Sequence, residues 1–357
     1  MMAERVLVAM SGGVDSSVSA YLLKEQGYDV VGITMHIWDL PDDNPRSCCG
    51  YQAINDAQRV CAKLDIPFYT IDVKPIFEEK VIKNFCDEYF TGRTPNPCIR
   101  CNEFIKFHYL RLKAKELNAK KIATGHYARI EYDQIKKRWL LKKGVDNHKD
   151  QSYVLYSMTQ EQLSETIFPL GNLKKSEVRA IAKKLNLAVA DKPDSQEICF
   201  IPDNNYRQFL VQKYKVKPIP GKIVDTQGNF IGEHYGIINY TVGQRKRIGI
   251  AASEPLYVVR IDAINNQIIV GPEKEVYQKR FYAGNLNFIS IDKLTEPTVA
   301  NAKIRYTHIP ALAKITPNNS QVEVIFNEPQ WAITPGQAVV FYDNDIVIGG
   351  GTIESVI

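Results

Sequence analysis

A glycine- and serine-rich loop near the amino terminus has the composition of a phosphate site. It reads SGGVDSS over residues 11–17, between a short apolar run and a helical one. Glycines allow a tight turn, and the following helix points its positive end and its free N–H groups at the same place. Serine hydroxyls add donors, and Asp15 offers a carboxylate for a magnesium ion. The loop lacks the ending of a Walker A motif, so it predicts another class of phosphate site.

Thiols are the second group that could carry chemistry. The chain has seven cysteines, and an odd number argues against a framework of structural disulfides. Two pairs are closely spaced, Cys48 with Cys49 and Cys98 with Cys101, while Cys199 stands far from both. Close spacing of this kind indicates reactive thiols or metal ligands.

The elements around these residues indicate an α/β protein with β-rich additions. Strands and helices alternate through about the first two hundred residues, which predicts a doubly wound parallel sheet with ligands at the carboxyl ends of its strands. We expect one of these strands over residues 121–130 and place the Cys98–Cys101 segment in a loop between two helices. Short glycine-punctuated runs then predict a small central β-rich domain and a C-terminal β-barrel. The expected boundaries are 1–207, 208–280 and 281–357.

The composition is typical of a globular protein but does not identify a ligand. Hydrophobic residues make up 45% and charged residues 24% of the 357, which is ordinary for a globular protein. The start of the chain lacks a signal-peptide pattern, and no apolar run is long enough to span a bilayer. We therefore expect a cytoplasmic protein with reduced thiols and no membrane partner. The net charge of +5 is compatible with nucleic acid but does not require it.

The loop resembles the PP-loop of ATP pyrophosphatases, which holds the pyrophosphate released when ATP adenylates a carbonyl oxygen. Enzymes with this loop pass the activated carbonyl to a nitrogen nucleophile, as in GMP synthetase, or to sulfur, as in tRNA thiolases. The loop alone leaves both outcomes open.

Motifs along essentially the whole chain make the resemblance specific. They are GRTPNP with a following CN (residues 92–102), ATGHY (123–127), NHKDQSYVLY (147–156), DSQEICFI (194–201), TVGQRKRIGI (241–250), RY (305–306) and TPGQ (334–337). In this order they are similar to those of the tRNA-specific 2-thiouridylases. The resemblance implies a PP-loop domain of the adenine nucleotide alpha-hydrolase type, followed by two β-rich domains that bind tRNA.

The resemblance also implies the reaction and its residues. ATP with Mg²⁺ would adenylate the 2-oxygen of the wobble uridine in the anticodon stem-loop of tRNA, and sulfur from a donor protein or a sulfide source would arrive on a cysteine. Cys199 would carry the persulfide, Cys101 would release the sulfur by forming a disulfide with it, and Asp15 would act in adenylation. The implied ATP contacts are Ala9, Met10, Ser11, Gly12, Gly13, Val14, Asp15, Ser16, Met35 and Gly125. The implied tRNA contacts are Asn96, Pro97, Cys98, His126, Lys149, Asp150, Gln151, Arg245, Arg247, Arg305, Tyr306 and Gln337.

Cys98 departs from the pattern, since many members of the family carry aspartate there. Cys98, Cys101 and Cys199 could then ligate three irons of a [4Fe–4S] cluster, with the fourth iron open for sulfide. A persulfide route and a cluster route both remain open at this point. A structural zinc site with Cys48 or Cys49 as the fourth ligand is a third reading.

Two other functions fit part of the sequence. The first is a PP-loop ligase or amidotransferase that acts on a small metabolite, which would need neither Cys101 nor Cys199. The second is a non-catalytic RNA-binding module with a metal cluster, which would keep the loop as a nucleotide sensor. Conversion of ATP to AMP that depends on tRNA would exclude the second.

Overall fold

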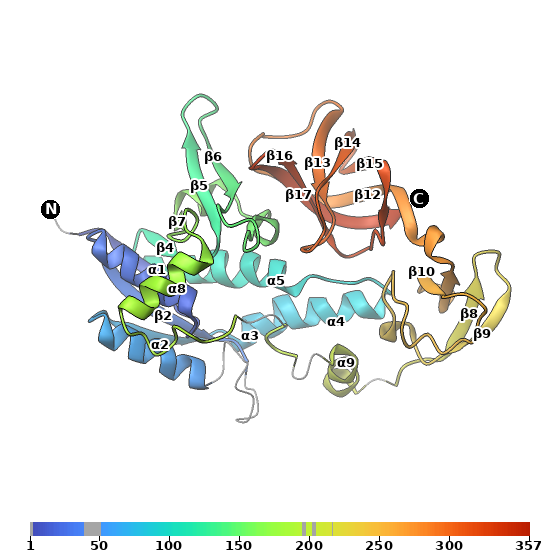
Figure 1. The fold of residues 1–357 in the computed structure, drawn as a ribbon, viewed down its shortest axis with the longest axis horizontal. Helices are drawn as coiled ribbons and strands as arrows, with labels where there is room; N and C mark the ends of the chain where they lie inside the picture. Colours follow the sequence, from blue (N-terminus) through green and yellow to red (C-terminus); the bar gives the residue numbers. More distant parts are fainter. Residues whose placement is uncertain (1–2, 39–50, 195–197, 202–204, 216) are drawn as a thin grey trace. The chain divides into compact units, whose positions relative to one another are not determined.

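The computed structural model describes residues 3–38, 51–194, 198–201, 205–215 and 217–357, and these fold as two compact units (Figure 1). The first unit comprises Met1–Val81, Cys98–Asn204 and Asp345–Val347, and the second comprises Ile82–Pro97, Asn205–Asn344 and Ile348–Ile357. In the described part of the chain, no helix combines the length and apolarity needed to cross a membrane.

A parallel sheet forms the centre of the first unit. Its strand order is β3-β2-β1-β4-β7, and each neighbouring pair of strands in it is parallel. Three successive residues of β1, Val6 to Val8, are fully buried, so both faces of this strand are covered, as a parallel sheet requires. The strands are β1 (Arg5–Ala9), β2 (Asp29–His36), β3 (Phe68–Asp72), β4 (Lys121–Ala123) and β7 (Thr166–Ile167).

Helices and one hairpin complete the first unit. Apolar residues of α1, α2 and α8 pack with β1 in one core, in which Val18, Val60 and Val178 take part. The helices are α1 (Val14–Glu25), α2 (Tyr51–Lys63), α3 (Lys74–Phe77), α5 (Pro97–Arg100), α6 (Leu110–Glu116), α7 (Gln160–Ser164) and α8 (Lys175–Lys184), with π-helical η1 (Glu78–Ile82) and η2 (Cys101–Tyr109) and 3₁₀-helical η3 (Ser152–Leu155). The antiparallel hairpin is β5 (Ala128–Asp133) with β6 (Arg138–Lys143).

Two β structures make up most of the second unit. The smaller is a four-stranded sheet of order β10-β11-β8-β9. The larger runs β12-β15-β14-β13-β16-β17, and β12 also pairs with β17, which closes these strands into a barrel. The elements are β8 (Gly221–Asp225), β9 (Phe230–His234), η5 (Ile237–Asn239), β10 (Tyr257–Asp262), β11 (Gln267–Gly271), η6 (Glu273–Val276), β12 (Tyr277–Phe288), β13 (Thr298–Lys303), β14 (Ala311–Asn318), β15 (Gln321–Trp331), β16 (Ala338–Asp343) and β17 (Ile346–Val356).

Residues 82–97 belong to the second unit although they precede much of the first in sequence. Helix α4 (Lys83–Phe90) packs on α9 (Tyr206–Tyr214), where Tyr89 stacks on Tyr206 with ring centroids 4.7 Å apart. Arg93 then pairs with Glu88 and Glu354 at 2.7 and 2.9 Å. These contacts tie the segment that ends in Pro97 to the barrel.

The expected fold class is confirmed, and two local predictions are wrong. A parallel α/β sheet, a central β-rich part and a C-terminal barrel are all present. The expected strand over residues 121–130 divides instead, because β4 ends at Ala123 and β5 begins at Ala128 in another sheet. Cys98 and Cys101 lie in helical turns rather than a loop, because Pro97 occupies the start of α5, where its missing N–H has no cost. The three domain boundaries remain predictions.

Candidate active site at the phosphate loop

The phosphate loop joins the carboxyl end of β1 to the amino end of α1, the place that the sequence predicted. Gly12 has a φ of +66°, which a side chain would strain, and Gly13 caps the helix in an extended conformation. The Ser16 hydroxyl accepts from Ser11 N–H at 3.1 Å, and the Ser17 hydroxyl donates to Gly13 O at 2.8 Å. These short-range bonds hold the loop in shape.

Two glycines allow other elements to lie directly against the loop. A Cβ on Gly12 would lie 2.3 Å from the carbonyl oxygen of Ala53 on α2. A Cβ on Gly125, just past β4, would lie 2.8 Å from the Ser16 nitrogen. Met35 is near the carboxyl end of β2, and Ala9 ends β1. The predicted ATP contacts thus come from β1, β2, the β4 end and α1, which meet at one edge of the sheet.

Asp15 is held by two side chains that lie far along the sequence. Lys175 Nζ is 2.7 Å from both carboxylate oxygens of Asp15. The Tyr127 hydroxyl donates to Asp15 Oδ1, also at 2.7 Å. Burial, together with the Asp15 charge, raises the pKa of Tyr127, so its hydroxyl keeps the proton that this bond needs. Lys175 is only 8% exposed, and a lysine is rarely buried this deeply without a paired charge.

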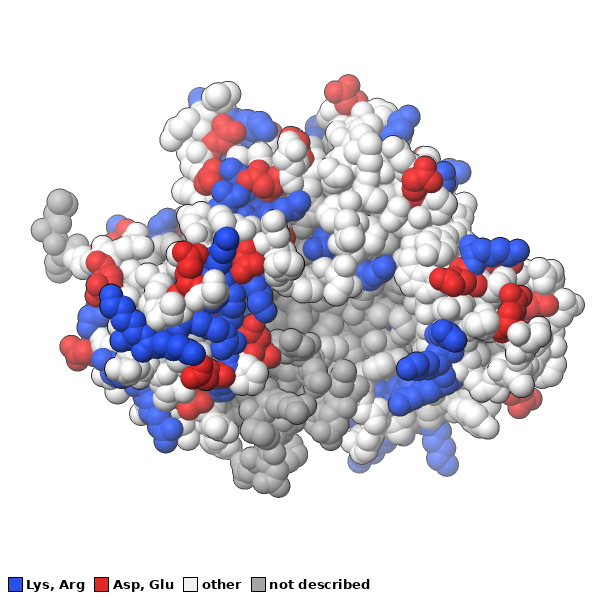
Figure 2. Space-filling view, viewed as in Figure 1, with Lys and Arg blue, Asp and Glu red and all other residues white. Residues whose placement is uncertain are grey.

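Asp194 connects the same lysine to two further cations. Its carboxylate lies 2.8 Å from Lys175 Nζ and 2.8 Å from Lys149 Nζ, and Arg179 Nη2 approaches at 3.3 Å. Burial acts to raise the pKa of Asp194, but hydrogen bonds from Lys149 and Lys175 outweigh it and hold that pKa below its ordinary value. Figure 2 shows Lys and Arg side chains gathered with Asp and Glu on the face of the first unit over α8. Asp194 also begins the motif that contains Cys199.

A second lysine contacts the backbone of the loop. Lys192 Nζ donates to Gly12 O at 3.0 Å and to Asp56 on α2 at 2.9 Å. Lys175 thus links the loop to α8. Lys192 links the loop to the segment after α8 and to α2. The cationic surroundings suit an anion with several charges, such as a pyrophosphate.

The cysteines of interest all reach the surface. Cys98 is exposed, and Cys101 and Cys199 are partly exposed. Cys199 precedes Phe200, whose ring is buried edge-on against Phe77 of α3 at 5.6 Å, so the chain is anchored directly after this thiol. Arg100, which lies between Cys98 and Cys101 in the sequence, pairs with Glu103 at 3.2 Å, which partly neutralises its charge.

The structure does not support the expected metal centre. Within the described ranges, no three histidine, cysteine, aspartate or glutamate side chains are placed to hold one metal ion. The described residues therefore give no support for a cluster held by Cys98, Cys101 and Cys199. Cys48 and Cys49, named for a zinc site, lie outside the described residues.

Several residues predicted to contact tRNA have structural partners in the first unit. His126 is buried with its ring near Phe107 and Phe168, and its Nδ1 lies 2.6 Å from the Thr124 hydroxyl. Asp150 accepts from the backbone of Gly144 and from Ser152. Gln151 accepts from the Tyr127 N–H at 3.0 Å.

The second unit brings four of the sequence motifs to one pocket. Its lining includes Thr94, Gly243, Arg305, Trp331 and Gln337. The Gln337 amide donates to the carbonyl oxygens of Thr94 and Pro95 at 2.8 and 3.2 Å. Arg305 donates to Trp331 O at 2.8 Å. The pocket is thus built by motifs that lie far apart in the sequence.

The remaining predicted RNA contacts of the second unit differ in exposure. Tyr306 is 43% exposed, and Arg245 and Arg247 are exposed in a turn where Arg247 has a φ of +64°. Asn96 is half-buried, and Pro97 is buried.

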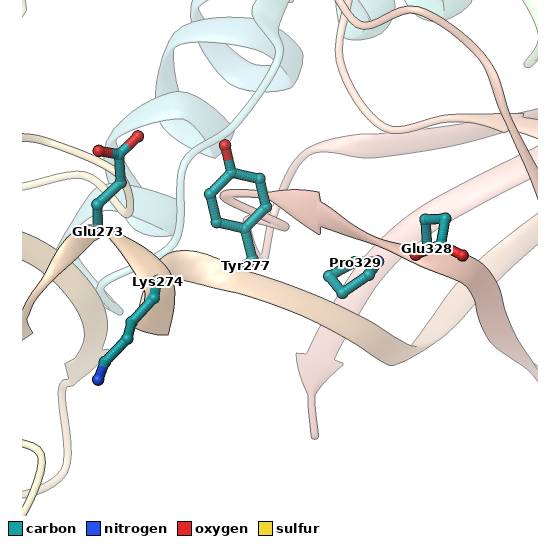
Figure 3. Close-up of a pocket in the computed structure, with 5 residues that line it drawn as sticks. All are labelled: Glu273, Lys274, Tyr277, Glu328 and Pro329. Atoms are coloured by element: carbon teal, nitrogen blue, oxygen red, sulfur yellow. The ribbon is translucent and has the colours of Figure 1, made fainter.

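A larger surface cavity of about 600 Å³ has unsuitable chemistry for a nucleotide (Figure 3). It is lined by Glu273, Lys274, Tyr277, Glu328 and Pro329, and the Glu273 and Lys274 side chains point to opposite sides. Two carboxylates beside a single lysine would repel a polyphosphate. The phosphate loop of the first unit remains the better candidate.

Comparison with known proteins decides the family. A family model described as "tRNA methyl transferase HUP domain" matches residues 4–203, and models for a PRC-barrel domain and an aminomethyltransferase β-barrel domain match 207–272 and 278–353. The tRNA-specific 2-thiouridylase MnmA 1 of Caldanaerobacter subterraneus subsp. tengcongensis is 56% identical over 98% of each chain. This chain belongs to the tRNA-specific 2-thiouridylase family.

Other relatives agree with this assignment. The 2-thiouridylase of Acetivibrio thermocellus is 55% identical over 99% of this chain and 100% of its own. Among solved structures, a 4-thiouridine synthetase–RNA complex with bound ATP is 16% identical, covers 59% of this chain and 50% of its own, and has a TM-score of 0.38. That structural likeness is too weak to add to the argument.

Sequence patterns of the family did not indicate Lys175, Tyr127 or Lys192 as parts of the site. One signal was available for Lys175, because a lysine in the first turn of a helix faces the positive end of the helix dipole. A lysine at this position is stabilised when a nearby carboxylate neutralises its positive charge. Tyr127 ends the ATGHY motif, but nothing in the spacing connected it to Asp15.

Proposed function

We propose that this 2-thiouridylase family member uses ATP to adenylate the 2-oxygen of the wobble uridine of tRNA and then replaces that oxygen with sulfur. Membership of the family, at more than half identity over nearly the whole chain, is the observation that carries the proposal. The phosphate loop, which contains Asp15 and has Lys175 beside it, supplies the kind of site that the first step needs.

The loop supports adenylation chemically. The uridine 2-oxygen attacks the α-phosphorus of ATP, the bond to the bridging oxygen breaks, and the electron pair leaves with pyrophosphate as uridine N3 loses its proton. The positive helix end and the loop N–H groups stabilise charge that develops on the leaving group. Asp15 places a carboxylate within the loop, and Mg²⁺ prefers one or two carboxylates together with phosphate oxygens. The bound ion would neutralise charge on the phosphates.

For sulfur transfer, we propose the persulfide route with Cys199 and Cys101. The outer sulfur of a Cys199 persulfide attacks carbon 2, and AMP leaves with the former 2-oxygen. The Cys101 thiolate then attacks Cys199 Sγ, which breaks the S–S bond and leaves sulfur on the uridine. A disulfide between the two cysteines results, and an external dithiol must reduce it before the next turnover. Partial exposure of both thiols is compatible with access for a sulfur donor protein and for this reductant.

No step is proposed through an iron–sulfur cluster. Among the described residues, no group of cysteine, histidine or carboxylate side chains is placed to hold a metal ion. Cys98 instead takes the position where many relatives carry aspartate, next to the segment Asn96–Pro97 proposed to contact the target base. The proposed tRNA-binding set also keeps His126, Lys149, Asp150, Gln151, Arg245, Arg247, Arg305, Tyr306 and Gln337.

The test is a reconstituted reaction under air-free conditions. The protein is incubated with ATP, Mg²⁺, unmodified tRNA and a persulfide source, and 2-thiouridine, AMP and pyrophosphate are measured. We expect AMP and pyrophosphate to form only with tRNA, and Asp15→Ala to stop their formation while tRNA binding persists. AMP formation without tRNA but with a small amide or carboxylate acceptor would favour the metabolite ligase. Binding of tRNA with no turnover of ATP would favour the non-catalytic module.

A further inference from the structure

The buried ammonium of Lys175 is a charged group at the loop that the family motifs do not explain. Its backbone N–H donates to Asp146 at 2.9 Å, which fixes the start of α8, and its side chain reaches across to Asp15. The Nζ lies between Asp15 and Asp194 at 2.7 and 2.8 Å. A cation with these distances and 8% exposure is built into the site rather than placed at a surface.

The two carboxylates depend on Lys175 to different extents. Asp194 also pairs with Lys149 and Arg179, so it keeps cations if Lys175 moves away. The carboxylate of Asp15 otherwise accepts a hydrogen bond from the neutral hydroxyl of Tyr127. Removing Lys175 from Asp15 therefore requires another cation on that carboxylate, or the charge of Asp15 would repel an incoming polyphosphate.

We propose that Lys175 is a further phosphate-binding residue for adenylation, and that it turns from Asp15 to the pyrophosphate part of ATP when Mg²⁺ takes its place on that carboxylate. This inference rests on the proposed function. Nothing larger than a side-chain rotation is needed, because Nζ already lies against the loop that offers its N–H groups to an anion. Lysine is a common phosphate ligand because its ammonium is a mobile point charge with three donors.

The proposed position gives Lys175 a defined part in the step. When the bond from the α-phosphorus to the bridging oxygen breaks, the electron pair and its negative charge pass to pyrophosphate. An ammonium beside those oxygens stabilises the transition state more than bound ATP. Loss of such a donor typically lowers kcat about 10²- to 10³-fold.

The first test compares Lys175→Met, Lys175→Arg and Lys183→Met. Lys183 lies on the same helix but pairs with Asp191 at the surface, so its removal is the matched control. We expect Lys175→Met to lower kcat for tRNA-dependent pyrophosphate release about 100-fold, with a smaller rise in the KM for ATP. Lys175→Arg should retain more activity than Lys175→Met, because it keeps the charge. Equal kcat in Lys175→Met and Lys183→Met would overturn the inference.

A second variant separates phosphate binding from simple charge balance. If Lys175 only neutralises Asp15, Lys175→Met with Asp15→Asn should recover thermal stability and should bind inorganic pyrophosphate without Mg²⁺ as tightly as Asp15→Asn alone. If Lys175 binds phosphate, the double variant should recover stability but bind pyrophosphate more weakly than Asp15→Asn. Recovery of both properties together would contradict our proposal.

The exchange at Asp15 can be measured without turnover. In thermal unfolding with Mg²⁺ alone, Lys175→Met should be stabilised at lower Mg²⁺ concentrations than the wild type, because the lysine no longer competes for Asp15. Inorganic pyrophosphate should bind Lys175→Met at least tenfold more weakly in the presence of Mg²⁺. Unchanged midpoints in both titrations would refute the exchange. If the wild type itself releases no pyrophosphate with tRNA, the proposed function fails. The binding titrations would still test whether Lys175 binds pyrophosphate.

Discussion

At the scale of single residues, the site depends on charges that are held in place by burial. Asp15, Lys175 and Asp194 form a continuous chain of ionic contacts, and Tyr127 adds a neutral hydrogen bond. Sulfur transfer has a different requirement, because the cysteine thiolate must be accessible to the sulfur donor and to the uridine that accepts the sulfur. Cys101 and Cys199 are accordingly partly exposed, whereas Cys61 is buried and its pKa rises to about 12 through desolvation.

Serine substitutions of the cysteines separate the two routes of sulfur transfer. Cys101→Ser and Cys199→Ser should stop 2-thiouridine formation while pyrophosphate release continues, because adenylation needs neither thiol. In the persulfide route, Cys98→Asp should keep substantial thiolation and Cys98→Ser some, because neither change removes the two thiols of that route. Iron content and 2-thiouridine are measured together on protein purified without air. Parallel loss of iron and thiolation in Cys98→Ser would instead establish the cluster route.

Buried His126 predicts a pH dependence of stability. Burial, with a smaller effect of Lys106, holds the pKa of His126 well below 6.5. The unfolded chain binds a proton as pH falls through 6.5, but the folded chain does not, so stability is lost toward acid. The slope from this residue is about 1.4 kcal/mol per pH unit below pH 6.5.

The variant His126→Gln should remove that part of the slope. Urea unfolding at pH 7.5 and at pH 5.5 measures it, and His148→Gln, which alters an exposed histidine, is the control. A stability difference between His126→Gln and wild type that is the same at both pH values would show that the buried ring takes up a proton without penalty.

At the scale of elements, the site is an edge of the parallel sheet where short connections meet. Strand β4 ends at Ala123, and the chain passes Gly125 directly against the amino end of α1. The contact explains why the strand predicted over residues 121–130 is interrupted. A continuous strand would carry side chains into the space that the loop occupies.

Gly125→Ala should therefore displace the phosphate loop. The added methyl would lie 2.8 Å from the Ser16 nitrogen. Because that nitrogen is a backbone atom, rotation of a side chain cannot relieve the contact. We expect kcat/KM for ATP to fall about tenfold or more, because overpacking typically costs about 1–3 kcal/mol. Gly284→Ala is the control, since its methyl would meet only side-chain atoms, the nearest at 3.3 Å. Wild-type kinetics in Gly125→Ala would mean that the loop tolerates movement.

At the scale of the whole molecule, each compact unit has its own candidate role. The first unit holds the phosphate loop and the cysteines proposed for sulfur transfer, while the second contains Arg245, Arg247, Arg305 and Tyr306. In the second unit, the amide of Gln337 reaches a segment 243 residues away, and Arg93 pairs with Glu354 of β17. Motifs GRTPNP and TPGQ are thus parts of one structure.

The exposed arginines of the second unit predict a salt-dependent affinity for tRNA. Replacing Arg245 and Arg247 by alanine should weaken binding and reduce the slope of log K against log salt by about two units, one for each phosphate contact. The site of modification should stay the same, because phosphate contacts carry no base information. Binding is measured over a range of salt concentrations, with exposed Lys293→Ala as the control. An unchanged slope would mean that both arginines only face solvent.

The sequence by itself determined the fold class, the phosphate loop and the family. These depend on local patterns, since alternating strands and helices, a glycine turn before a helix and ordered motifs are all readable along the chain. The motifs RY and TPGQ were also recognised in the sequence. No motif indicated that the Gln337 amide donates to the carbonyl oxygen of Thr94.

Only the tertiary structure decided which charges meet at the loop. Lys175 and Asp15 are 160 residues apart, and Lys192 and Gly12 are 180 apart. Their contacts arise because parallel strands bring connections from distant parts of the chain to one sheet edge. The spacing of residues along the sequence does not predict which of them become close in space. The same holds for the metal site, since CxxC spacing predicts ligands, but ligation requires side chains that converge in space.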